Sequence, residues 1–192
     1  MSDFVAWMPE GPALDALESL CAAVPSAFPG LPPLRFRARA QFHMTLRFLA
    51  EGLPADPAPL YAALADVAAR TPRLALRIDR IETWPGANVL VARTAPDEDL
   101  STLFARLDAA ARACGHAGEA RPPSPHITLA YAATRERLPA LPTRWPSSTP
   151  LPLPIATEIG SIALARTAPA RYDTVHWWPL GESGAPPSMH LD

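Results

Sequence analysis

The sequence predicts an α+β fold with two pseudo-symmetric lobes around a central cleft, each lobe an antiparallel or mixed sheet with helices on its outer face. Stretches of alternating polar and apolar residues, typical of strands, are separated by single helical segments. The connecting turns are too short for repeated parallel crossovers. A His-x-Thr motif also occurs twice, 83 residues apart in a chain of 192. We expect residues 1–180 to form one bilobal domain and residues 181–192 a flexible tail.

The composition is that of a globular protein. Hydrophobic residues make up 48% of the chain, which is enough for a core, and charged residues make up 19%. The 25 prolines cluster between periodic segments and predict rigid loops. With a formal net charge of −2, any contact with nucleic acid must come from a local positive patch.

The N-terminus and the cysteines indicate a cytoplasmic protein. The first residues lack a basic start followed by an apolar run, so we expect no signal peptide. No stretch approaches the roughly 20 apolar residues of a membrane span. The two cysteines, Cys21 and Cys114, do not make a disulfide framework and are interpreted as free thiols.

The first half of the chain alternates strands with helices. An apolar run that ends at Pro9 predicts an interior strand at residues 4–8. Gly11-Pro12 opens a helix that we expect to close before Pro25. Residues 34–48 alternate almost throughout, but this is long for one strand, so we expect a break or bend at residues 38–41. Apolar residues at helical spacing predict a helix at residues 60–68, stopped by Pro72.

The second half follows the same plan. Residues 74–81 predict a strand with a slip in register near Arg80, and Trp84-Pro85-Gly86 predicts a turn before a strand at residues 89–92. Acidic residues 97–99 favour a helix N-terminus, and Gly115 is a natural stop for that helix. The remaining expected elements are the second motif strand after the proline-rich residues 121–125, a loop at 134–149, and closing strands at 155–165 and 172–178.

The two motifs are Phe42-His43-Met44-Thr45-Leu46 and Pro125-His126-Ile127-Thr128-Leu129. Residues i and i+2 of a strand point to the same face. His43 therefore projects with Thr45, and His126 with Thr128. The alternate residues face the buried side, and in the first motif these are Phe42, Met44, Leu46 and Phe48.

An imidazole beside a hydroxyl, presented twice, could act on a phosphate from both sides. A single His-x-Thr is usually structural, but repetition in a matching context favours function. We interpret the other histidines, His116, His176 and His190, as structural.

The sequence lacks the patterns of other common catalytic sites. We expect no metal and no cofactor, because the spacing of a zinc site, the Gly-x-Ser-x-Gly of a serine hydrolase and the Gly-rich phosphate loop are all missing. An arginine series could form an electropositive face near His43 or a solvated strand face, and both interpretations stay open; its members are Arg35, Arg37, Arg39 and Arg47. Core packing is favoured over base stacking for Trp84, Tyr131, Tyr172 and Trp177.

Residues 42–49 and 121–129 resemble the two motifs of the 2H phosphoesterase superfamily. The likeness is to its bacterial RNA 2′,3′-cyclic phosphodiesterases, also called 2′–5′ RNA ligases. Similarity extends diffusely through residues 3–180, including the opening strand at residues 4–9, Trp84-Pro85 and Arg171-Tyr172.

The resemblance implies metal-independent hydrolysis of the terminal 2′,3′-cyclic phosphate of RNA to a 2′-phosphomonoester. It assigns His43 as proton donor and His126 as proton acceptor, with Thr45 and Thr128 donating hydrogen bonds to the phosphate. The expected partner is RNA with a cyclic phosphate end or a small cyclic nucleotide. We expect the protein to be a monomer and to bind no membrane. Two alternatives stay open: 2′–5′ RNA ligation by the reverse reaction, and a non-catalytic module that binds RNA ends.

One position departs from the family. Its members commonly carry a phosphate-binding arginine shortly after the second motif, where this chain has Tyr131. Either another arginine, such as Arg47, supplies the charge, or the substrate preference has shifted. We therefore expect Arg47, Tyr131 and Phe42 to contact substrate.

Overall fold

The computed structural model describes residues 2–95, 97–119, 122–142, 149–169 and 171–181. Two antiparallel sheets and three α-helices within these ranges confirm the predicted α+β class. The four-stranded sheet, in the order β3-β1-β8-β9, consists of β1 (Asp3–Trp7), β3 (Met44–Leu49), β8 (Ser161–Ala168) and β9 (Arg171–Pro179). The five-stranded sheet, in the order β2-β6-β5-β4-β7, consists of β2 (Leu34–Phe36), β4 (Leu74–Trp84), β5 (Val89–Thr94), β6 (His126–Ala132) and β7 (Ile155–Ile159).

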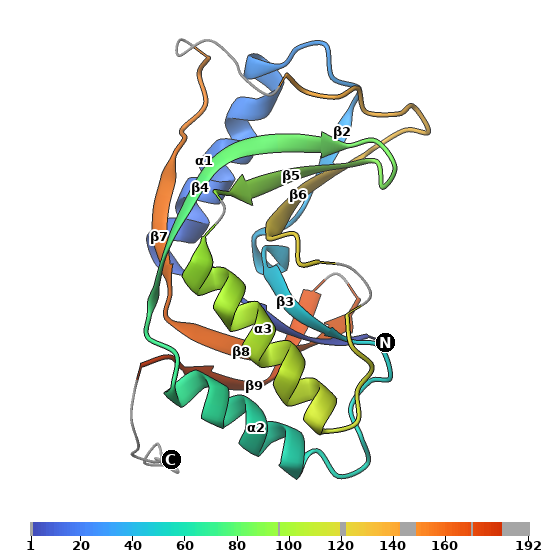
Figure 1. Ribbon diagram of the computed structural model, residues 1–192. Helices are drawn as coiled ribbons and strands as arrows, with labels where there is room; N and C mark the ends of the chain where they lie inside the picture. Colours follow the sequence, from blue (N-terminus) through green and yellow to red (C-terminus); the bar gives the residue numbers. More distant parts are fainter. Residues whose placement is uncertain (1, 96, 120–121, 143–148, 170, 182–192) are drawn as a thin grey trace, which may run out of the picture.

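Each sheet and the helices beside it form one lobe of the molecule. The helices are α1 (Gly11–Ala27), α2 (Ala58–Ala69) and α3 (Glu98–Ala113), with a short 3-10 turn η1 (Arg39–Gln41). Helix α1 lies beside the five-stranded sheet, and α2 and α3 lie beside the four-stranded sheet (Figure 1). Contacts of α1 with β7, of α2 with β9 and of α3 with β3 hold each helix in its lobe. None of the helices in the described ranges has the length and apolar character needed to cross a membrane.

The chain passes repeatedly between the lobes. The break predicted at residues 38–41 is confirmed: η1 lies there, and it separates β2 in one sheet from β3 in the other. Residues 155–165, predicted as one strand, are instead split at Gly160 into β7 and β8 of different sheets. A side chain at Gly160 would lie only 3.3 Å from the Arg73 guanidinium, so the crossing point is a close approach. The lobes are therefore not the two halves of the sequence.

The helix boundaries follow local chemistry with one exception. The Asp97 side chain accepts the Leu100 N–H at 2.7 Å, and Gly115 has a φ of +91°, as expected for the two ends of α3. Helix α1 continues to Ala27 instead of closing before Pro25. A proline in the last turn removes only one backbone hydrogen bond, and the helix closes when the Phe28 N–H donates to Val24 O at 2.9 Å.

The core has a large and a small part. A single cluster of buried side chains draws on both lobes and includes Leu17 of α1, Leu103 of α3 and Leu164 of β8, all fully buried. A separate small cluster of Phe4, Ala6 and Ala165 lies on the four-stranded sheet, with Met8 and Tyr172 packed against it. We call this second surface the histidine face of the four-stranded sheet, because it is the surface on which His43 lies.

The shared core predicts that the lobes unfold together. Leu164→Ala should lower the free energy of unfolding by about 2–5 kcal/mol, because the truncation leaves a cavity in a close-packed cluster. Urea unfolding followed by circular dichroism should stay a single transition. Val175→Ala, at an exposed position of the same sheet, is the matched control and should change stability by about 0.5 kcal/mol or less. Two separate transitions, only one of them shifted, would contradict a common core.

Candidate active site

The first histidine is held by its own backbone. His43 directly precedes β3, and its Nδ1 lies 3.0 Å from the carbonyl oxygen of Gln41, the last residue of η1. A carbonyl oxygen only accepts hydrogen bonds, so Nδ1 carries the proton and Nε2 is left to exchange one. Thr45 follows inside β3, opposite Ala6 of β1, and therefore shares the histidine face.

The second histidine repeats this arrangement on the other sheet. His126 opens β6, and its Nδ1 lies 2.7 Å from the carbonyl oxygen of Ser124, again two residues earlier. Its Nε2 is likewise the free nitrogen. Thr128 pairs with Val91 of β5 and lies on the same side as His126, which pairs with Arg93. We call this surface the histidine face of the five-stranded sheet.

A β-bulge follows the first motif. On β3, Thr45 pairs with Ala6 and Arg47 pairs with Val5, so Leu46 has no opposite residue. The extra residue reverses the alternation, and Arg47 points away from the histidine face. The residue that returns to the face is the third after the threonine, Phe48, which pairs with Phe4 and is 42% exposed, contrary to the expectation that it is buried.

A second bulge follows the second motif at the equivalent leucine. Thr128 pairs with Val91 and Ala130 with Leu90, so Leu129 has no opposite residue. The third residue after this threonine, Tyr131, pairs with Val89 and so lies on the histidine face. Bulges of this kind are common beside active sites, where they redirect side chains.

The two faces meet at the histidines. Strands β3 and β6 contact each other across the lobes and lie next to one another at the centre of Figure 1. The Tyr172 ring of β9 lies 4.4 Å from the His43 ring, and its hydroxyl accepts a hydrogen bond from Arg37, which follows β2 of the other lobe. The charge of His126 acts on His43, so the imidazoles are within electrostatic reach of each other.

Each imidazole lies among aromatic side chains and beside one arginine. His43 contacts Phe4 at 5.1 Å in addition to Tyr172, and His126 contacts Trp84 at 4.5 Å, measured between ring centroids. In the described residues no protein group hydrogen-bonds to the hydroxyl of Thr45 or Thr128, so both hydroxyls are free to donate to a ligand. No group of three or more His, Cys, Asp or Glu side chains gathers into a possible metal site within these ranges.

The surroundings favour the neutral imidazoles. Burial lowers the pKa of His43, and the charges of Arg37 and His126 lower it further, against the opposing effect of the Gln41 carbonyl. Burial also lowers the pKa of His126, with Arg93 as the nearby charge and the Ser124 carbonyl opposing it. A bound anion would reverse this balance, because opposite charge favours the protonated form.

Comparison with known proteins identifies the family. A family model for the 2′–5′ RNA ligase superfamily matches residues 52–171, and a model for LigT-like phosphoesterases matches residues 9–91. The chain belongs to the 2′–5′ RNA ligase superfamily. A search of curated proteins found no match.

Solved structures share the fold of this 2′–5′ RNA ligase superfamily member. TT0787 of Thermus thermophilus is 24% identical with a TM-score of 0.70, over 96% of this chain and 100% of that one. Escherichia coli LigT complexed with 3′-AMP is also 24% identical, with a TM-score of 0.65 over 94% and 98%. LigT complexed with NADP+ gives 24% and 0.64 over the same shares.

Two of the residues expected to contact substrate do not lie at the histidines. The Arg47 side chain is 4% exposed and forms ion pairs with Asp108 of α3 and Glu119, because the bulge at Leu46 turns it toward the helices. Phe42 is 2% exposed and belongs to the large core. Tyr131, by contrast, lies on the histidine face.

The arginine series does not form one face. Arg39 pairs with Asp15 and Glu18 of α1, and Arg47 is buried. Arg35 and Arg37 both lie over the Tyr131 ring, and the charge of Arg37 acts on His43. Arg93, Trp84 and Tyr172 were not expected at the site. The sequence would indicate Arg93 only if the pairing of Arg93 with His126 across β5 and β6 were known.

The other described histidines lie elsewhere. His116 is buried with its Nδ1 3.3 Å from Glu51, and exposed His176 stacks on Tyr61 of α2 with ring centroids 5.3 Å apart. His190 lies outside the described residues, as do residues 182–192 of the expected tail.

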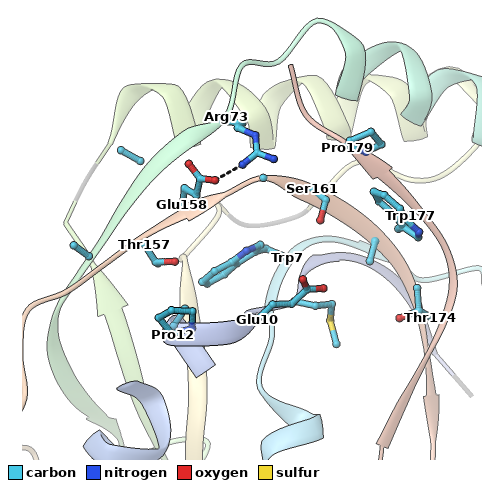
Figure 2. A pocket seen from close by; sticks show the side chains of 16 residues that line it. Trp7, Glu10, Pro12, Arg73, Thr157, Glu158, Ser161, Thr174, Trp177 and Pro179 are labelled. Carbon is cyan, nitrogen blue, oxygen red and sulfur yellow. Dashed lines mark hydrogen bonds and ion pairs between the residues drawn. The ribbon is translucent and has the colours of Figure 1, made fainter. Parts of the chain in front are cut away.

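A cavity of about 1210 Å³ adjoins the histidine face of the four-stranded sheet. Met8, which packs against the cluster under His43, is one of its lining residues. Figure 2 shows Trp177 and Pro179 of β9 on one side of the cavity and the Arg73–Glu158 ion pair on another. No sequence pattern indicates this cavity.

The arginines should act separately on the two imidazoles. In the free protein, proton NMR should show both histidines titrating below their ordinary pKa of 6.5. Arg93→Gln should raise the pKa of His126 and leave that of His43 nearly unchanged, and Arg37→Gln should do the reverse, because each removes one neighbouring positive charge. Equal shifts of both histidines in either variant would show that the charges are not placed as described.

Proposed function

We propose that this protein hydrolyses the 2′,3′-cyclic phosphate at the 3′ end of RNA to a 2′-phosphomonoester, with two histidines as the acid/base pair. The proposal is supported by one observation above all. Two imidazoles from different lobes each have Nδ1 bound to a backbone carbonyl, and within the described part of the chain their Nε2 atoms and the following threonine hydroxyls have no protein partner. The fold also accommodates nucleotides in a relative, since E. coli LigT has been crystallised with 3′-AMP, NADP+ and ATP.

In the proposed reaction, one imidazole activates water and the other protonates the leaving group. His126 Nε2 takes a proton from a water molecule, whose oxygen forms a bond to phosphorus. The bond from phosphorus to the ribose 3′ oxygen breaks on the opposite side, and His43 Nε2 donates its proton to that oxygen. The product has a 2′-phosphate and a free 3′-hydroxyl. The histidines then exchange protons with solvent to restore their starting forms.

The neighbouring groups suit this reaction. Thr45 and Thr128 would donate to the non-bridging oxygens, where negative charge develops. Both imidazoles have a lowered pKa in the free protein. The anionic phosphate would raise the pKa of the donor on binding, so the substrate itself promotes the protonated form that the reaction needs.

The same residues could also catalyse 2′–5′ ligation, with an RNA hydroxyl in place of water as the nucleophile. Attack by the 5′-hydroxyl of a second RNA on the cyclic phosphate would use the same base, acid and in-line geometry and would join the two ends. Hydrolysis is favoured in dilute aqueous solution because water is far more concentrated than RNA ends. A binding module without catalysis would need neither the free Nε2 atoms nor their pairing across two lobes.

Substitution of either histidine tests the pair. In buffer with EDTA, the wild type should convert a nucleoside 2′,3′-cyclic phosphate to the 2′-phosphate isomer, identified by chromatography. His43→Ala or His126→Ala should each reduce kcat by at least about 10²-fold, the usual scale for losing an acid or base. His176→Ala is the matched control, because its exposed ring stacks on Tyr61 away from the site.

Circular dichroism should show that all three variants keep the fold. Turnover that persists in either motif variant, or a 3′-phosphate as product, would refute the assigned roles.

A further inference from the structure

Arg37 places a positive charge between the two lobes. Its backbone N–H donates to Leu129 O at 2.8 Å, at the bulge of the second motif. Its guanidinium donates to the Tyr172 hydroxyl of the opposite lobe at 2.9 Å. The same guanidinium lies over the rings of Tyr131 and Tyr172, 5.5 and 5.8 Å from their centroids.

This cation has no acidic partner among the described residues. Arg39 and Arg47, from the same stretch of chain, each pair with two carboxylates. Arg37 instead contacts neutral tyrosines, which fix its position but leave its charge unbalanced. A guanidinium has five N–H donors, and the Tyr172 hydroxyl takes only one of them. The remaining donors and the charge suit two oxygens of a phosphate.

We propose that Arg37 binds the phosphate of the substrate at this site, which rests on the function proposed above. Arg37 lies near enough to His43 for its charge to act on that imidazole. The Tyr131 ring lies under the Arg37 guanidinium, so an arginine side chain at position 131 could place its own guanidinium where that of Arg37 lies. Arg93, beside His126, is held by the Ser124 hydroxyl at 2.6 Å and stays on its own lobe.

The test moves the positive charge from Arg37 to position 131 of β6. Arg37→Gln keeps a polar side chain but removes the charge, and should lower kcat/KM about 10²-fold. It should also weaken binding of inorganic phosphate, measured by isothermal titration calorimetry. Adding Tyr131→Arg to that variant should recover at least about tenfold in both measurements. Arg35→Gln is the matched control: it contacts Tyr131 but not Tyr172, and should stay within threefold of wild type.

The outcomes separate this proposal from the proposed function. If Arg37→Gln stays within threefold in both measurements, or if Arg35→Gln loses as much, Arg37 does not bind the phosphate. If the wild type hydrolyses no cyclic phosphate but binds phosphate in an Arg37-dependent manner, the function fails and the anion site stands. If Tyr131→Arg gives no rescue while circular dichroism shows an intact fold, the phosphate does not bind at the place of the Arg37 guanidinium.

A different observation concerns the cavity next to the four-stranded sheet. Thr45, Ala6, Ala163 and Trp177 pair in succession across its four strands and form one row on the histidine face. Three strand spacings separate the ends of the row, about 14 Å. Both alanines between them are buried, Ala6 completely. This row connects the first motif to Trp177, a tryptophan that is 58% exposed and lines the cavity.

The lining of the cavity suits an uncharged planar group. Trp177 offers an exposed ring, and Ser161 and Thr174 offer hydroxyls (Figure 2). The arginine in the lining, Arg73, is already paired with Glu158, and the other charged lining residue, Glu10, is acidic, so the lining residues offer no unbalanced positive charge for a phosphate. Bases of single-stranded RNA are commonly bound by stacking on an aromatic side chain with a few hydrogen bonds beside it.

We infer that the cavity binds the base of a nucleotide that precedes the terminal one, which carries the cyclic phosphate. The preferred substrate is then an oligonucleotide; this too rests on the proposed function. Trp177→Ala should raise KM about 5- to 100-fold for a short oligoribonucleotide ending in a cyclic phosphate, the range expected for a lost base stack. Its KM for a nucleoside 2′,3′-cyclic phosphate should not change. Val175→Ala, on the same strand but outside the cavity, is the matched control.

Binding can be measured without turnover. In a His126→Ala background, the oligoribonucleotide should bind more weakly when Trp177 is also replaced, as followed by fluorescence anisotropy of a labelled RNA. Equal effects of Trp177→Ala on the oligonucleotide and the mononucleotide, or no effect on either, would overturn the subsite. Trp177-dependent binding of RNA by a protein without hydrolytic activity would preserve the subsite and reject the function.

Discussion

The geometry of the site depends on two β-bulges, one at Leu46 and one at Leu129. Strand alternation brings each histidine and threonine to one face, but it would also place the second residue after the threonine there. The extra residue in each strand changes this pattern, so that the third residue, Phe48 or Tyr131, returns to the face. The same irregularity turns Arg47 into the protein interior, where carboxylates balance its charge.

The lobes complete each other because the chain crosses between them. The first histidine lies just beyond η1, where the chain leaves the five-stranded sheet for the four-stranded one. Tyr172 of β9, near the end of the described chain, reaches both His43 and Arg37. Since the large core also draws on both lobes, both the site and the hydrophobic core are shared between them.

The charge of the site is local, as the net charge of −2 requires. One arginine lies near each histidine, while acidic side chains neutralise other arginines of the molecule. An electropositive, partly buried site disfavours protonated imidazoles until an anion binds. Binding and proton transfer would thus be coupled through the same charges.

Features that depend on near neighbours in the chain could be predicted from the amino-acid sequence. The α+β class, the helix stop at Gly115, the break before the first motif, and the two His-x-Thr pairs all follow from periodicity and turn chemistry. Strand pairing decided which arginine reaches the histidines. Arg37 and Arg47 have the same place in the polar/apolar alternation, and the sequence carries no local signal for the bulge that reverses the alternation at Leu46. The presence of Tyr172, Trp84 and Arg93 at the site has the same origin, since pairing between distant strands, and not sequence distance, sets their neighbours.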